Sequence, residues 1–121
     1  MYATRQSVTV TTASDGSATV YSENVSGRLV NVIYTKNNFT NGVDFTIVSE
    51  ATGQTIWTEE NINASKVVSP RQAAHSVAGV ALVYAASDPV TAPIVLASDR
   101  VKIQIANGGN ATTGTFTLIF E

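Results

Sequence analysis

The stretch RVKIQIANGGNATTGTFTLIFE, residues 100–121, decides the fold class of this chain. Apolar residues occupy every second position from Val101 to Ile105, and again from Phe116 to Phe120. A period of two places alternate side chains on opposite faces of a strand, which is typical of a half-buried β-sheet. We therefore predict that the two runs form an antiparallel hairpin around the polar loop at 107–110.

The same alternation recurs along most of the chain. Val43, Phe45 and Ile47 share one face of a predicted strand, and Gly53, in a left-handed conformation, turns the chain into a partner strand at 54–59. The pair Asp15-Gly16 between alternating runs predicts another hairpin. Residues 27–36 are apolar on both parities, which predicts a strand buried on both faces or near the middle of a sandwich.

The pattern predicts an all-β protein. Strands recur about every ten residues, and no apolar stripe with helical spacing follows a capping box. We expect one domain, 1–121, folded as a single antiparallel β-sandwich of about eight strands with a jelly-roll-like plan. An immunoglobulin-like sandwich is the alternative, although its Cys-Trp-Cys pattern is missing. Residues 64–99 are the least regular part: we expect a strand at 79–85, a turn bracketed by Asp88-Pro89 and Ala92-Pro93, and a short strand at 94–96.

Composition restricts the partners. Only 13% of the 121 residues are charged and the formal net charge is -2, so the chain lacks the clustered cations that nucleic-acid binding requires. It has no cysteine, hence neither a disulfide nor a thiolate metal site. No apolar run resembles a signal sequence or reaches the roughly 20 residues of a membrane helix. We expect synthesis in the cytoplasm and no membrane or nucleic-acid partner.

The sequence does not favour catalysis or metal binding. His75 is the only histidine, and no Gly-x-Ser-x-Gly elbow supplies a nucleophile for it. One histidine without cysteine cannot build a zinc site, and the aspartates are scattered rather than arranged in a calcium loop. We expect no catalytic residues, no metal and no cofactor.

A contact surface is the better prediction for the segment between Pro70 and Pro93. The segment combines prolines, which stiffen loops, with side chains that suit interfaces and with several Ala and Val residues that provide flat apolar surface. The candidate interface residues are Pro70, Arg71, His75, Tyr84 and Pro93. An alternative contact is an aromatic platform for sugar rings made by Trp57 and Tyr34, although a sandwich core uses such residues as readily.

Several short motifs together resemble a known family. They are Gly27-Arg28-Leu29, Asp44-Phe45-Thr46-Ile47 with Glu50-Ala51-Thr52-Gly53, Ser69-Pro70-Arg71, Asp99-Arg100-Val101-Lys102, and Gly108-Gly109-Asn110 with Thr113-Gly114-Thr115-Phe116. The combination is similar to the small capsid decoration, or cement, proteins of tailed bacteriophages, over most of the chain after Gly27. The resemblance implies a non-enzymatic virion protein, made in the host cytoplasm, that bridges major-capsid subunits, often as a trimer or dimer. The alternative is a carbohydrate-binding or receptor-binding sandwich associated with a phage tail.

Overall fold

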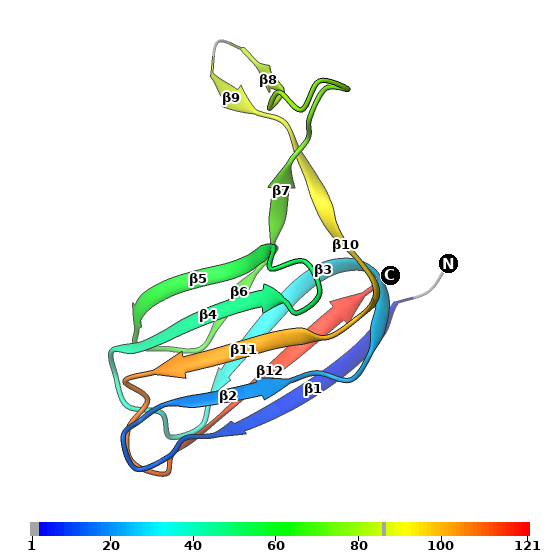
Figure 1. Ribbon diagram of the computed structural model, residues 1–121. Coiled ribbons are helices and arrows are strands. Elements are labelled where there is room, and N and C mark those ends of the chain that lie inside the picture. The colour runs from blue at the N-terminus through cyan, green and yellow to red at the C-terminus, as the bar shows by residue number, and fades with distance from the viewer. Residues whose placement is uncertain (1–2, 86) are drawn as a thin grey trace.

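The computed structural model describes residues 3–85 and 87–121, and over these residues it is built from strands with no helix (Figure 1). The strands are β1 (Thr4–Thr11), β2 (Ala18–Tyr21), β3 (Val25–Lys36), β4 (Val43–Ser49), β5 (Thr55–Ile62), β6 (Lys66–Val68), β7 (Arg71–Ala73), β8 (Val83–Tyr84), β9 (Asp88–Pro89), β10 (Thr91–Asp99), β11 (Val101–Ala106) and β12 (Thr113–Phe120). The described part of the chain contains no helix that is long and apolar enough to span a bilayer.

Two antiparallel sheets form the sandwich. Sheet A has the order β1-β12-β3-β10-β7, with β6 added beside β3, and sheet B has the order β2-β11-β4-β5. The strands pair as a long folded hairpin: β1 with β12, β2 with β11, β3 with β10, and β4 with β5. Successive pairs fall alternately into sheets A and B, which is the jelly-roll arrangement. The all-β sandwich expected from the sequence is confirmed.

Two of the expected hairpins are wrong. β11 and β12 alternate as expected, but β11 lies in sheet B and β12 in sheet A, so the loop at 107–112 connects the two sheets. The Asp15-Gly16 turn likewise joins β1 of sheet A to β2 of sheet B. A period of two predicts which side chains face the core, but it does not predict which strands pair with each other. Both turns therefore connect the two sheets at one end of the sandwich, and neither is the turn of a hairpin.

The hairpin of β4 and β5 is confirmed. Ile47 pairs with Trp57, and Gly53 in the connecting turn has φ of +74°, the left-handed conformation expected there. Val43, Phe45 and Ile47 are buried, as their shared parity predicts. Sheet B therefore contributes this face to the core.

β3 explains why residues 27–36 are apolar on both parities. Phe120 of β12 pairs with Leu29 while Ile119 pairs with Asn31, so Val30 is an extra residue that forms a β-bulge. The bulge shifts the buried positions from Leu29 to Val32 and Tyr34. β3 pairs with β12, β10 and β6, which makes it the central strand of sheet A.

An aromatic cluster fills the middle of the core. The rings of Tyr34 and Phe116 stack at 5.3 Å, and Phe45 packs edge-on against Tyr34 and Trp57 at 4.6 and 5.3 Å. Phe39 covers the flank, where β12 carries Gly114 because a Cβ there would overlap the Phe39 ring. Burial raises the pKa of Tyr34 to about 12, and its hydroxyl has no hydrogen-bond partner among the described residues.

The chain between β5 and β10 departs most from the sequence expectations. β6 returns to sheet A, and residues 71–85 and 87–93 then leave the sandwich as a projection, which we call the arm (Figure 1). The strand expected at 79–85 is reduced to β8, and the turn expected between Asp88-Pro89 and Ala92-Pro93 is wrong, because these residues form β9 and the start of β10. The short strand expected at 94–96 is part of the nine-residue β10. These small additions raise the strand count from the expected eight to twelve.

Candidate functional site

The arm begins as a two-stranded stem. Its strands are β7 and the first residues of β10, with Arg71 opposite Pro93 and Ala73 opposite Thr91. Gln72 reinforces the stem because its Nε2 donates to the carbonyl of Pro93 at 2.9 Å and its Oε1 accepts from Gln54 Nε2 at 2.7 Å. The second bond fixes the base of the arm to the end of sheet B.

Above the stem the chain divides into two small hairpins at a closed ring of backbone hydrogen bonds. The amide of Ala74 donates to the carbonyl of Val90 (3.0 Å), Leu82 to Ala74 (2.9 Å) and Val90 to Leu82 (3.1 Å). We call this ring the three-way junction. The first hairpin turns at Gly79 and is closed by a bridge between His75 and Ala81, and the second consists of β8 and β9.

The two hairpins expose apolar side chains without forming a core. Five large hydrophobic residues are exposed on them: Val77, Val80, Leu82, Val83 and Tyr84. Between Ala74 and Thr91 only Asp88 carries a formal charge at neutral pH. Exposed apolar ground of this kind, with few charges, is typical of a surface that binds another protein.

A second apolar area lies on the outer face of sheet A. Ile94 and Leu96 point into the core, so Val95 between them faces solvent and is 58% exposed. Val67 of β6 is 59% exposed and lies opposite Ile33 of β3. Ile119 of β12 alternates with buried Leu118 and Phe120 and is half-buried on the same outer side. We call Ile33, Val67, Val95 and Ile119 the outer stripe.

The structure places the candidate interface residues on or at the arm. His75 and Tyr84 are exposed on its two hairpins, while Arg71 and Pro93 face each other in the stem. Pro70 is different, because it is buried at the base and offers no surface to a partner. The sequence pattern did not identify the outer stripe, because it could not tell that β6 and β10 are neighbours of β3.

The aromatic alternative is corrected by burial. Trp57 is 7% exposed and its Nε1 donates to Glu59 Oε1 at 3.1 Å, while Tyr34 is 0% exposed. Stacking on a sugar needs an open ring face, so neither ring forms the platform considered above. Both belong to the core.

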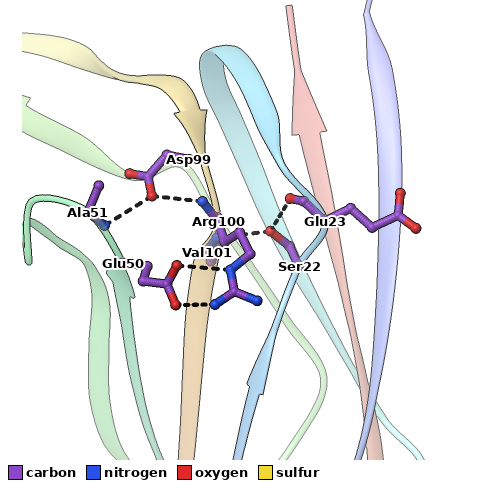
Figure 2. A network of polar contacts seen from close by, with 7 residues as sticks. All are labelled: Ser22, Glu23, Glu50, Ala51, Asp99, Arg100 and Val101. Atoms are coloured by element: carbon purple, nitrogen blue, oxygen red, sulfur yellow. Dashed lines mark hydrogen bonds and ion pairs between the residues drawn. The ribbon is translucent and has the colours of Figure 1, made fainter.

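A polar network holds the corner where β10 of sheet A passes into β11 of sheet B (Figure 2). The Oδ1 atom of Asp99 accepts from the amides of Ala51 (3.0 Å) and Arg100 (2.7 Å), and its Oδ2 atom accepts from the Ser49 hydroxyl. Asp99 and Ser49 are 5% and 1% exposed. This carboxylate thus links the corner to the turn between β4 and β5.

The rest of the network surrounds Arg100. Its guanidinium forms a two-pronged ion pair with Glu50 and lies 4.3 Å from the ring centre of Tyr21. Buried Ser22 accepts from the amide of Val101 at 2.9 Å, which ties the end of β2 to the start of β11. The network connects three parts of the sandwich and is structural.

The charges of the network shift their own pKa values. Burial alone would raise the pKa of Asp99, but the hydrogen bonds from Ser49, Ala51 and Arg100 outweigh it, and the pKa is lowered. The hydrogen bond from Arg100 lowers the pKa of the exposed Glu50 carboxyl. Both groups are therefore held in the charged form.

His75 is remote from this network. It lies on the first hairpin of the arm, and no described Ser, Asp or Glu side chain forms a hydrogen bond with its ring, so the structure assembles no nucleophile and base around it. Within residues 3–85 and 87–121, no three His, Asp or Glu side chains gather where they could hold a metal ion.

An open groove of about 510 Å³ runs along the edge strands β1 and β2. Arg5, Gln6, Tyr21 and Glu23 are among its lining residues, and Gln6 Oε1 accepts from the amide of Glu23 at 3.0 Å across it. The groove is the open side of the sandwich between two sheet edges.

Comparison with known proteins adds little. No protein-family model and no curated protein matches the chain. Four chains of solved structures match, among them one from "Structure of infectious bursal disease virus Gx strain" with a TM-score of 0.33 and 13% identity. That match covers 98% of this chain and 32% of the viral chain, so this chain spans about a third of its length. A TM-score this low supports no conclusion about fold or function, so the fold assignment depends on the strand order described above.

Proposed function

We propose that this chain is a non-enzymatic virion protein that decorates a phage capsid and stabilises it by bridging major-capsid subunits. The observation that carries the proposal is the arm, a nearly uncharged projection with five exposed large hydrophobic side chains. The resemblance of the sequence to cement proteins supports the same function.

The arm is poorly suited to independent stability. A two-stranded hairpin is at best marginally stable in water, and the arm is made of short strands of two or three residues. Burying one Val or Leu side chain fully is worth about 1.5–3 kcal/mol, so contact with a partner would stabilise both the partner and the arm. A projection of this kind fits bridging because it reaches beyond the body of its own subunit.

The sandwich supplies the rigid support for such a contact. Jelly rolls are a common architecture of viral capsid domains, and their closed pairing leaves few edges exposed. We propose that the protein acts as a homo-oligomer, a trimer, on the virion. Several weak contacts per oligomer then add through multivalency.

Co-sedimentation with the cognate expanded capsid tests the proposed function. The purified protein should bind the shell saturably, and the decorated shell should withstand heating to a higher temperature than the bare shell. A β-sandwich of similar size and charge serves as the control and should remain in the supernatant. Absence of binding to capsids, with retention on a glycan column instead, would overturn the proposal.

A further inference from the structure

Strand β1 forms an open edge of sheet A (Figure 1). It pairs with β12 without a bulge, from Thr4 opposite Phe120 to Thr11 opposite Thr113, and no other described strand pairs with it. Its eight residues contain one charge, Arg5, and no proline. The groove of about 510 Å³ runs beside the strand. Proteins usually protect such an edge with charges, prolines or bulges, because its backbone groups pair readily with another strand.

The hydrogen bonds at the end of β1 show which of its residues face the open edge. The amide of Thr12, directly after β1, donates to the carbonyl of Thr112 on the β12 side at 2.9 Å. Hydrogen-bonded and non-hydrogen-bonded pairs alternate along an antiparallel ladder. The hydroxyls of Ser7 and Thr117 lie 3.3 Å apart, which fits a pair without backbone hydrogen bonds. The residues of β1 that direct their backbone N–H and C=O away from β12 are therefore Arg5, Ser7, Thr9 and Thr11.

The other sheet edges are short or interrupted. β2 has four residues, and β6 and β7 have three each. β5 carries Glu59 and Glu60 and shifts its register twice against β4, while β10 shifts its register between Leu96 and Asp99. Among the described strands, β1 is thus the one edge with a long, regular and nearly uncharged ladder. The strand of this chain that matches β1 in length and regularity is the β1 of a second copy.

The sequence of β1 suits antiparallel pairing with itself about a two-fold axis at Val8. In this register Arg5 lies opposite Thr11, and Ser7 lies opposite Thr9, so every outward-directed backbone group gains a partner. Pairs of Ser and Thr across two strands are favourable, whereas like charges directly opposite are not, and the two Arg5 side chains stay apart. Val8 faces the core but is only half-buried, and the Val8 of the second copy lies opposite it on the axis.

The side of the sandwich that contains β1 is large enough for a stable contact. Eight residues at about 3.4 Å each give an edge about 27 Å long. Two sheets about 10 Å apart, with their side chains, make this side about 20 Å deep. Each copy can therefore bury about 500 Å², and two copies together reach the roughly 1,000 Å² that a specific interface needs.

We propose that two copies of this chain pair through β1, antiparallel and with Val8 on the two-fold axis, so that sheet A continues from one copy into the other. The contact is isologous, because both copies use the same surface. It is distinct from the arm and from the three-fold contact of the proposed trimer. On a shell it links neighbouring trimers, and this setting alone rests on the proposed function.

A proline at Thr9 tests the backbone pairing. Thr9→Pro removes an N–H that points to the open edge and leaves the ladder with β12 intact, and edge strands tolerate proline where the N–H side faces solvent. Thr9→Val is the matched control, because it keeps the N–H and the branched shape of threonine. Circular dichroism should show that both variants fold as wild type does.

Light scattering at micromolar concentration gives the readout for these proteins. Thr9→Pro should have half the mass of wild type, with at least a tenfold loss of self-affinity. The variant is then a monomer of 12.7 kDa, or a trimer where the three-fold contact also forms in solution. Thr9→Val should keep the mass of wild type.

A cysteine at Val8 tests the register in a protein whose edge is otherwise unchanged. The chain has no cysteine of its own, so a disulfide can form only between the introduced residues. Facing residues without backbone hydrogen bonds have Cα atoms about 4.5 Å apart, within the range that a disulfide spans. Under mild oxidation Val8→Cys should crosslink into a covalent dimer at least tenfold faster than Thr46→Cys, which is exposed on the outer side of sheet B.

Two results would overturn the pairing of β1. One is a wild type with the same mass as Thr9→Pro, and the other is a Val8→Cys protein that crosslinks no faster than Thr46→Cys. None of these measurements uses a capsid. A protein that pairs through β1 but does not bind the capsid would therefore refute the decoration function alone.

Discussion

At the scale of single residues, Asp99 is the side chain on which the sheet-crossing corner depends. Asp99→Asn should lower the free energy of unfolding by about 1.5–3 kcal/mol, because hydrogen bonds to a buried carboxylate are the strong kind. The folded pKa of Asp99 is lowered, so its contribution is complete above the unfolded pKa of about 3.9 and is lost as the pH falls through the folded value. Urea unfolding at pH 7 and pH 3 measures both effects. The difference between variant and wild type should shrink at pH 3, and an undiminished difference would contradict the assignment.

Also at this scale, the side chains of β4 test which face is core. Ile47→Asp should abolish cooperative unfolding, because burying an unpaired carboxylate costs several kcal/mol of a total of about 5–15. Thr46→Asp, one residue away on the exposed side, should change stability by less than about 1 kcal/mol. Circular dichroism during thermal unfolding compares the two. Equal damage at both positions would mean that the assigned face is wrong.

At the scale of elements, the sequence predicts strands and their buried faces better than it predicts their partners. The alternation at 43–47 and 101–105 identifies the side chains that the structure buries, because the period of a strand is local. The partner strands of β11 and β12 could not be predicted in the same way. β11 pairs in sheet B and β12 in sheet A, and the alternation within a strand carries no information about which distant strand lies beside it. Asp99, Ser49 and Ser22 are polar residues, and they are buried only because of the contacts made across the corner between the sheets. The outer stripe could not be predicted for the same reason, because its residues share one face only through the pairing of distant strands.

The arm is the element whose stability depends most on a partner. Its three-way junction has three backbone hydrogen bonds, and among the described arm residues beyond it no hydrophobic side chain is buried. In the protein without a bound partner the amides of Ala74, Leu82 and Val90 should exchange with solvent roughly 100-fold faster than that of Ile103 in sheet B. Binding of a partner protein to the arm should slow their exchange. Hydrogen exchange followed by NMR measures both states, and junction amides as protected as Ile103 in the unbound protein would show that the arm is stable by itself.

At the scale of the whole molecule, pairing of β1 with β12 joins Thr4 to Phe120 across nearly the full sequence. On a translating ribosome, β1 therefore has no strand to pair with until residue 120 has left the exit tunnel. β3 waits likewise for β10 and β12, although β6 can pair with it earlier, whereas the β4–β5 and β8–β9 hairpins have their partner strands close behind them. Such non-local pairing is typical of folding in milliseconds to seconds. β1 and β2 must thus remain without a partner strand until β12 and β11, the last two strands of the chain, have emerged.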